Sequence, residues 1–177
     1  MTDKILVTYA TRYGSTQEVA ETVAEILREG GFEVDVQSMR TVRTLEGYGA
    51  VVLGAPLYVG KWPKHAHRFL LRFEEALVKL PVAIFALGPI HDDEDEILGS
   101  RVQLDTELKK YPWLKPVALE MFVGKYDPSK FHFFDRLIAS MPASPIYKMP
   151  ASDHRDWVAI HIWAGKLVST LQPTPAR

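Results

Sequence analysis

Short, almost continuously apolar runs recur along the chain and are separated by amphipathic segments. Such runs are typical of strands buried on both faces of a parallel sheet, because only a strand covered by helices on both sides has no polar face. A further run alternates apolar and polar residues, which indicates a strand at an edge of the sheet. Buried strands are expected at residues 5–9 and 50–54, further apolar strands at residues 82–87 and 116–124, and the edge strand at residues 32–36.

Apolar residues at helical spacing lie between these strands. We expect one helix directly after residues 11–16, one that begins at Pro63 and one that ends before Pro112. The last helix is predicted to begin at Asp153 as its N-cap. His161 falls on the apolar stripe of that helix, so a hydrogen-bonded position in the core is expected. The apolar faces are Val19, Val23, Ile26 and Leu27; Phe69, Leu70, Phe73 and Leu77; Val102, Leu104 and Leu108; and Trp157, Ile160, Ala164, Leu167, Val168 and Leu171.

The predicted order of elements is β-α-β-β-α-β-α-β-α, which indicates a single α/β domain over residues 1–177 with a parallel sheet and helices on both faces. In an open sheet of this kind, the ligand binds outside the carboxyl ends of the strands, where the strand order reverses. Residues 11–16, 56–62 and 88–91 follow three of the buried strands. These three loops are therefore the candidate binding site.

The first loop has the composition of a phosphate-binding site. A strand, a loop of small and hydroxyl-bearing residues and a helix N-terminus aim free backbone N–H groups and the positive end of the helix dipole at one point. The alternative is a capping box, in which Ser15 and Glu18 serve only their own helix. The chain has no G-x-G-x-x-G motif, which favours a mononucleotide over a dinucleotide. The candidate residues are Thr11, Arg12, Tyr13, Gly14, Ser15 and Thr16.

The other two loops place aromatic and apolar side chains beside backbone amides. A flavin needs both, because its ring system is apolar at one edge and forms hydrogen bonds at the other. Alternatively, Trp62 packs on the core at the start of the next helix. A nucleoside-triphosphate loop is excluded, because residues 54–61 are one residue too long and Trp62 stands where a metal-binding Ser or Thr is required. The candidate residues are Pro56, Leu57, Tyr58, Val59, Gly60, Lys61 and Trp62, with Gly88, Pro89, Ile90 and His91.

Length and charge narrow the class of protein further. A chain of 177 residues is long enough for one domain with a sizeable core. The net charge of −1, without a Lys/Arg stripe, argues against a nucleic-acid partner.

No apolar run approaches the ~20 residues of a membrane span, so no transmembrane segment is predicted and a cytoplasmic location is expected. The chain has no Cys, which excludes disulfides and thiol chemistry. Residues 172–177 are expected to be a disordered tail.

No metal site is predicted from the sequence. Residues 92–96 are consecutive carboxylates, but they lack the alternating ligands and central Gly of a calcium loop, so a solvated acidic turn is expected. His65 and His67 are two positions apart, which places them on different sides of a helix and disfavours a shared metal ion.

Residues 126–150 form an insertion between the last strand and the last helix, longer than such connections usually are. An insertion of this kind is tolerated mainly where it has a function. We consider a lid over the cofactor, a homodimer surface and a peripheral contact with the inner face of a membrane. The alternative is that it packs on its own sheet. Its apolar stripe is Phe131, Phe134, Leu137, Ile138 and Met141.

Residues 11–16 resemble the T-x-T-G-x-T phosphate loop of flavodoxin-fold FMN proteins, with Tyr13 in place of the middle Thr. Within that fold, the chain looks closest to the menaquinone-dependent protoporphyrinogen oxidase branch. The resemblance covers nearly the whole chain and implies a flavodoxin-like five-stranded sheet in the order 2-1-3-4-5, with FMN as the cofactor and the backbone near Gly60 at the flavin N5 edge. The matching segments are residues 54–57, 60–62, 126–128 and 134–136 and the Asp156-Trp157 pair.

The function that this resemblance implies is an FMN-dependent oxidoreductase that oxidises protoporphyrinogen with a quinone as acceptor. The flavin carries the chemistry in such a protein, so no catalytic side chain is predicted. The alternative is a non-enzymatic flavodoxin-type electron carrier with a redox protein as partner. Carriers commonly use strongly charged docking faces, which a net charge of −1 does not favour. A response-regulator domain is not indicated, because residues 8–10 contain no carboxylate.

Overall fold

Five parallel strands form the central sheet of the computed structural model, which describes residues 4–144 and 146–172. Their order, β2-β1-β3-β4-β5, confirms the predicted order 2-1-3-4-5. Of the tail expected to be disordered, residues 173–177 lie outside the described residues. The strands are β1 (Lys4–Tyr9), β2 (Glu33–Ser38), β3 (Ala50–Pro56), β4 (Val82–Leu87) and β5 (Ala118–Phe122).

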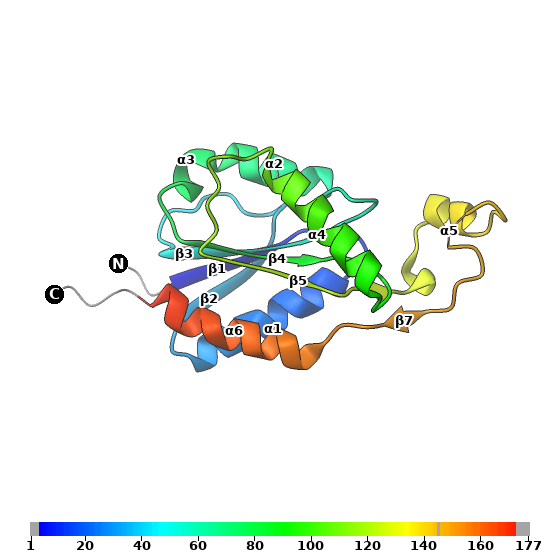
Figure 1. Ribbon diagram of the computed structural model, residues 1–177. Helices are drawn as coiled ribbons and strands as arrows, with labels where there is room; N and C mark the ends of the chain where they lie inside the picture. The colour runs from blue at the N-terminus through cyan, green and yellow to red at the C-terminus, as the bar shows by residue number, and fades with distance from the viewer. Residues whose placement is uncertain (1–3, 145, 173–177) are drawn as a thin grey trace.

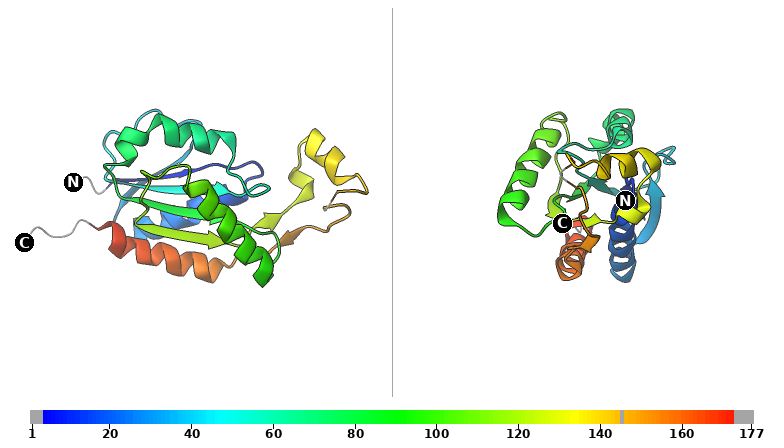
Figure 2. Two further views of the ribbon diagram at one scale, coloured as in Figure 1. Left: turned by 45° about the horizontal axis from the view of Figure 1, so that its top comes forward. Right: turned by 90° about the vertical axis from the view of Figure 1, so that its right-hand side faces the viewer.

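Helices cover both faces of the sheet, as predicted (Figure 1). On one face, α1 (Ser15–Glu29) and α6 (Trp157–Leu171) lie side by side, and α2 (Lys64–Arg72), α3 (Glu74–Leu77) and α4 (Glu94–Leu108) cover the other (Figure 2). The helices bury most of their predicted apolar faces against the sheet, which gives two hydrophobic clusters, one on each side. The prediction was wrong for Val102, which is 59% exposed on the outer side of α4. Burial of these stripes, rather than intrinsic propensity, supplies most of the stability of such helices.

The centre of the sheet is buried on both faces. Every residue of β3 and β4 is buried, which agrees with their continuously apolar sequences. In β2, at the edge, only Val34 is buried, as its alternating sequence predicted. β5, at the other edge, is likewise only partly buried, although its sequence is largely apolar.

The last helix begins later than the sequence predicted. Its N-cap is Asp156, whose carboxylate accepts a hydrogen bond of 2.9 Å from the amide of Ala159. Asp153 lies outside the helix, and its carboxylate binds Arg155 instead. The prediction for His161 was also wrong, because the side chain is exposed, with Nδ1 2.6 Å from the carbonyl oxygen of Trp157.

The acidic run 92–96 is a helix start rather than a turn. Asp93 is the N-cap of α4, and its Oδ1 accepts hydrogen bonds from the amides of Asp95 and Glu96 at 3.1 and 3.2 Å. Carboxylates in a first turn interact favourably with the positive end of the helix dipole. The run therefore stabilises the start of α4, which the expectation of a solvated turn missed.

The insertion projects beyond the carboxyl edge of the sheet on a short antiparallel ribbon (Figure 1). The ribbon pairs β6 (Lys125–Tyr126) with β7 (Ser152–Asp153). Between them lie a 3₁₀ turn, η1 (Pro128–Lys130), and a short helix, α5 (Phe133–Ala139). The ribbon fixes both ends of the insertion, so that the segment extends from the rim where β1, β3 and β4 end.

Substitution of Gly54 tests how tightly the centre of the sheet is packed. A Cβ at Gly54 would lie 2.2 Å from Cζ of Phe85, which is completely buried. We expect Gly54→Ala to lower the free energy of unfolding by about 1–3 kcal/mol through overpacking. Gly165→Ala is the control, because a Cβ there meets nothing within 4 Å and Ala favours the helix by about 0.5–1 kcal/mol. Urea unfolding followed by circular dichroism measures both, and equal midpoints would contradict the prediction.

Candidate functional site

A pocket of about 600 Å³ opens at the carboxyl edge of the sheet, beyond the ends of β1, β3 and β4. Its walls come from the loops that follow these strands, from α4 and from the insertion. The three predicted loops therefore meet at one site. Their residues in the pocket wall are Arg12, Tyr13 and Ser15; Leu57, Tyr58, Val59 and Gly60; and Gly88, Pro89 and Ile90.

Several predicted residues lie outside the pocket wall. Pro56 is buried at the end of β3, and Lys61 is exposed. His91 is also exposed, with Nδ1 3.0 Å from Oε1 of Glu96 in the first turn of α4. Of the first loop, Thr11, Gly14 and Thr16 do not line the pocket.

Trp62 lies in the core and not at the pocket. Its side chain is buried among apolar residues of the α2–α4 layer. Its amide donates a hydrogen bond of 3.3 Å to Oε2 of Glu107, a buried carboxylate on α4 that also contacts His67 and Lys110. The structure thus gives Trp62 the core position that the sequence left as the alternative. Tyr58 is the aromatic side chain of this loop that lines the pocket.

The first loop leads into the N-terminus of α1, as predicted. Gly14 is the N-cap residue with φ of +93°, a left-handed conformation that glycine adopts without steric cost. Its amide donates a hydrogen bond of 2.9 Å to Oγ1 of Thr11, which holds the loop. The Oγ1 atom of Thr16 is buried and has no hydrogen-bond partner among the described residues. An anion at this helix N-terminus would provide that partner.

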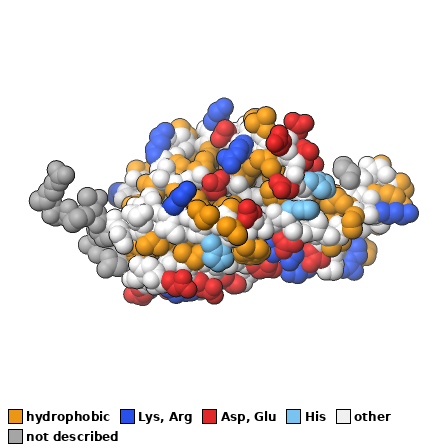
Figure 3. Space-filling view, turned by 60° about the horizontal axis from the view of Figure 1, so that its bottom comes forward, with side chains coloured by type: hydrophobic (Ala, Val, Ile, Leu, Met, Phe, Trp, Pro, Cys, Tyr) orange, Lys and Arg blue, Asp and Glu red, His pale blue; other side chains and the backbone are white. Residues whose placement is uncertain are grey.

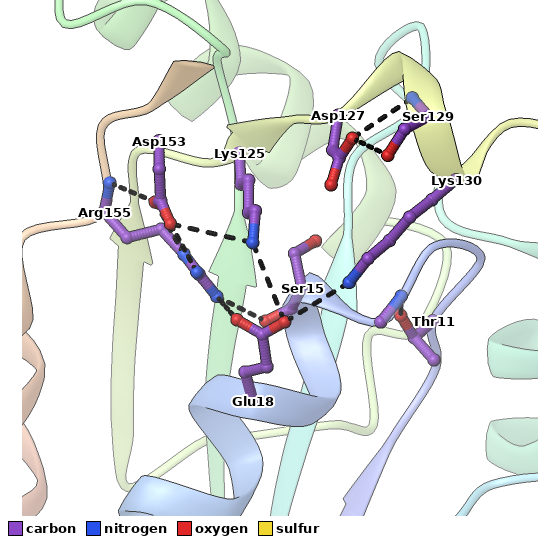
Figure 4. A network of polar contacts seen from close by, with 10 residues as sticks. Thr11, Ser15, Glu18, Lys125, Asp127, Ser129, Lys130, Asp153 and Arg155 are labelled. Carbon is purple, nitrogen blue, oxygen red and sulfur yellow. Dashed lines mark hydrogen bonds and ion pairs between the residues drawn. The ribbon is translucent and has the colours of Figure 1, made fainter. Parts of the chain in front are cut away.

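The capping box does not form. Ser15 is the first residue of α1 rather than its N-cap, and Glu18 pairs with Nη1 of Arg155 at 2.7 Å. Arg155 also donates to the carbonyl oxygen of Ser15 at 3.2 Å and to both carboxylate oxygens of Asp153 at 2.8 and 2.5 Å (Figure 4). The hydrogen bonds from Arg155 lower the pKa of Asp153. Arg155 therefore ties the returning strand of the insertion to α1.

The second loop is a tight turn at the rim of the pocket. Tyr58 and Lys61 exchange backbone hydrogen bonds of 2.9 and 3.0 Å. Between them, Val59 has φ of +49° and Gly60 has φ of +72°. A β-branched residue is strained in this region, and the side chain of Val59 is fully exposed. A Cβ at Gly60 would lie 2.9 Å from Gln103, so the turn packs closely on α4.

Two tyrosines form a neutral aromatic wall. The rings of Tyr13 and Tyr58 lie 6.0 Å apart, edge to face. Burial raises the pKa of Tyr58 to about 12. Burial, followed by a hydrogen bond to Asp135, raises the pKa of Tyr13. Both phenols therefore stay protonated at neutral pH, where they act as apolar surface and hydrogen-bond donors rather than as bases.

The insertion contributes pocket residues that the sequence reasoning did not assign. Arg12 donates two hydrogen bonds to Asp135 of α5 at 2.6 and 2.7 Å, and the ring of Tyr13 lies 4.9 Å from that of Phe131. The available signal was its position directly after β5, whose carboxyl end lies at the same rim. The insertion residues in the wall are Lys125, Tyr126, Asp127, Lys130, Phe131, Asp135, Ile138 and Ile146.

The outer face of α5 is apolar and open to solvent. Phe133 and Phe134 are 76% and 74% exposed, and Leu137 is 53% exposed. Figure 3 shows hydrophobic side chains at the surface of this projecting end. Phe131, which the sequence placed in the same stripe, instead packs between Tyr13 and Tyr126.

The described ranges 4–144 and 146–172 hold neither a metal cluster nor a membrane-spanning helix. Within them, no group of three or more His, Asp or Glu side chains is arranged to hold a metal ion. No helix in the same ranges is both long and apolar enough to cross a membrane.

The fold is a doubly wound parallel α/β sheet, with a helix N-terminus after the first strand and tyrosines lining a pocket at its carboxyl edge. This is the arrangement in which such sheets bind nucleotides. Comparison with known protein families shows to which of them this chain belongs. The family model described as a flavodoxin domain matches residues 6–153. The chain belongs to the flavodoxin domain family, whose members bind FMN.

Individual relatives agree with this assignment. The chain is 29% identical over 144 residues to protoporphyrinogen IX dehydrogenase [quinone] of Escherichia coli, covering 78% of this chain and 77% of that protein. It is 32% identical over 89 residues to an NAD(P)H dehydrogenase (quinone) of Acidovorax ebreus, covering 38% and 44%. Among solved structures, a mutant flavodoxin from Pseudomonas aeruginosa superimposes with a TM-score of 0.57 at 15% identity, covering 95% and 98%.

The ion pair between Arg12 and Asp135 is expected to hold α5 against the first loop. Asp135→Asn removes the charge, so hydrogen exchange of the amides in α5 should become several-fold faster. Arg12 is 48% exposed, so the free energy of unfolding should fall by less than ~1 kcal/mol. Asp105→Asn, on the exposed surface of α4, is the control. Unchanged exchange in α5 would mean that other contacts hold the insertion.

Proposed function

We propose that this protein is an FMN-dependent oxidoreductase that passes electrons from a small-molecule substrate to a quinone, with protoporphyrinogen as the candidate substrate. The observation that carries the proposal is a pocket lined by Ser15, from the first turn of α1, by Tyr13 and Tyr58, and by residues of the insertion. The similarity to protoporphyrinogen IX dehydrogenase [quinone] supports this choice of substrate and acceptor.

The phosphate end of FMN fits the N-terminus of α1. The first amides of a helix have no acceptors within the helix. The buried Oγ1 of Thr16 also has no partner among the described residues, and Ser15 adds a hydroxyl at the pocket wall. Thr11 would act indirectly, because its Oγ1 already accepts the hydrogen bond from Gly14 that shapes the loop.

The ring end of FMN fits the aromatic part of the pocket. Tyr13, Tyr58 and Leu57 would bind the ring system through apolar contacts. Gly60 and Gly88 would allow the backbone to approach it closely. Bound FMN supplies the one- and two-electron chemistry, and these residues bind and orient it.

The insertion would close one side of the pocket and exclude water from the ring. Phe131, Ile138 and Ile146 are apolar wall residues that reach the pocket from outside the sheet. The exposed aromatic face of α5 lies on the same segment, and quinones are apolar enough to bind such a surface. An electron carrier has no need of this second apolar surface.

Removal of the Thr16 hydroxyl tests whether the phosphate of FMN binds at the N-terminus of α1. Thr16→Val keeps the shape of the side chain and removes the unpartnered hydroxyl, so the protein without FMN should be as stable as wild type or more stable. FMN binding should weaken roughly ten- to a hundredfold, because a hydrogen bond to a charged group contributes about 1.5–3 kcal/mol. Titration of the apoprotein with FMN, followed by fluorescence quenching, measures the affinity.

Thr8→Val is the matched control for this substitution. Thr8 also has a buried Oγ1 without a partner among the described residues, but it lies within β1 and not at the N-terminus of α1, where the phosphate is proposed to bind. Its substitution should leave FMN affinity unchanged. Equal FMN affinity of the Thr16→Val variant and the wild-type protein would mean that the phosphate binds elsewhere.

Substitutions on the outer face of α5 distinguish the proposed enzyme from an electron carrier. In the variant Phe133→Ser/Phe134→Ser, each lost apolar contact is worth about 1.5–3 kcal/mol, so quinone-dependent oxidation of protoporphyrinogen should fall at least roughly tenfold. FMN content and reduction of a one-electron protein acceptor should not change. The control is Val158→Ser/Ile162→Ser, on the exposed face of α6.

The outcomes separate the two functions. Loss of the quinone reaction alone supports the enzyme. If both reactions continue at the wild-type rate, α5 has no part in quinone binding. A wild-type protein that reduces the protein acceptor but does not oxidise protoporphyrinogen would be a carrier instead.

A further inference from the structure

Lys130, at the end of η1, reaches from the insertion to the loop in front of α1. Its Nζ lies 3.9 Å from the position that a Cβ on Gly14 would occupy, and it lines the pocket together with Ser15. Figure 4 shows its ammonium group between Glu18 and Thr11. A cation from the insertion thus stands where the proposed phosphate would bind.

Three cations surround the carboxylate of Glu18, and they are not equivalent. Arg155 is 2% exposed and pairs with Glu18 at 2.7 Å. Lys130 and Lys125 lie 3.7 and 3.8 Å from Glu18, beyond the ~2.7–2.9 Å of a charge-assisted hydrogen bond. Each ammonium group carries three N–H donors, so the lysines keep hydrogen-bonding capacity that Glu18 does not use.

Lys130 is better placed than Lys125 to turn toward a ligand. Lys125 is 23% exposed on β6 and lies between two carboxylates, Glu18 and Asp153, at 3.8 and 3.9 Å. Lys130 is 45% exposed, and Glu18 is its salt-bridge partner among the described residues. A flexible side chain with one long contact can turn toward an arriving anion at little energetic cost.

The charges near Lys130 also favour a phosphate. The neighbouring carboxylate of Asp127 accepts hydrogen bonds of 3.1 and 2.5 Å from the amide and hydroxyl of Ser129, so it is already occupied. A phosphate monoester carries about −1.5 to −2 charges at pH 7. At the start of α1 it would face Glu18 in the first turn of that helix. A cation between the two anions offsets their repulsion.

We propose that Lys130 is a ligand of the FMN phosphate and turns from Glu18 to the phosphate when the cofactor binds. The inference rests on the FMN binding proposed above and adds a residue that the first loop does not contain. Because Lys130 belongs to the insertion, the same contact holds the insertion over the pocket. Phosphate binding and closure of the insertion are therefore coupled.

Comparison of FMN with riboflavin tests this assignment, because riboflavin has the same ring system without the phosphate. Lys130→Met should weaken FMN binding about ten- to a hundredfold and leave riboflavin binding within about twofold. Lys148→Met, in the same insertion but outside the pocket wall, should bind both flavins like wild type. Fluorescence titration of each apoprotein gives the Kd values, and thermal unfolding without flavin shows that each variant folds.

Glu18→Gln gives a prediction of opposite sign. Removal of this carboxylate releases Lys130 and removes the repulsion, while Arg155 keeps its two hydrogen bonds to Asp153. If thermal unfolding shows that the variant is folded, FMN should bind several-fold more tightly, with riboflavin unchanged. Hydrogen exchange should also show that FMN, but not riboflavin, slows exchange in residues 128–139 of the wild-type protein. In the Lys130→Met variant, this protection should be lost.

Several results would overturn the inference. FMN binding by Lys130→Met with the wild-type Kd would show that Lys130 is no phosphate ligand. An equal loss of FMN and riboflavin affinity would show that Lys130 acts through the fold alone. A wild-type protein that binds FMN while Lys130→Met changes nothing defeats only this inference, whereas a wild-type protein that binds neither flavin defeats the proposed function with it.

Discussion

The structure depends on the complete burial of β3 and β4. A strand without a polar face must be covered on both sides, which requires helical crossovers, and these make the strands parallel. Parallel strands place their carboxyl ends at one edge, so the loops after β1, β3 and β4 converge there. The pocket is a consequence of how the core is buried. Sequence changes in these loops can therefore alter the ligand without altering the fold.

The insertion is held at the pocket by a second constraint, which is electrostatic. Arg155 is almost completely buried, and a buried guanidinium is strongly destabilising unless carboxylates pair with it. Its partners come from two segments, Asp153 on β7 and Glu18 on α1. The pairing fixes where the insertion returns to the sheet. On the other side, Arg12 and Asp135 connect α5 to the first loop. The insertion is thus attached to the residues that would bind the phosphate, and not only to the sheet.

The pocket has two ends with different physical properties. At one end, burial keeps Tyr13 and Tyr58 protonated, so the wall is neutral and aromatic. At the other end, Lys125 and Lys130 stand near the N-terminus of α1, whose free amides and dipole favour an anion. FMN has the same division between a flat, largely apolar ring system and an anionic phosphate. The family assignment and the pocket therefore agree on physical grounds that are independent of sequence similarity.

The sequence by itself determined the strands, their order in the chain and the three loops at the carboxyl edge, because these follow from local periodicity and from the geometry of parallel sheets. Tertiary structure decided the features that depend on contacts between distant segments. Trp62 lies in the core because apolar residues of α2 and α4 enclose its side chain, and Glu107, from α4, accepts a hydrogen bond from its backbone amide. The last helix begins after Asp153 because the carboxylate of Asp153 accepts hydrogen bonds from Arg155 and is therefore not free to cap the helix. Lys130 reached the first loop through the path of the insertion. Periodicity describes a residue's own segment, whereas these positions were set by charges and volumes that other segments supplied.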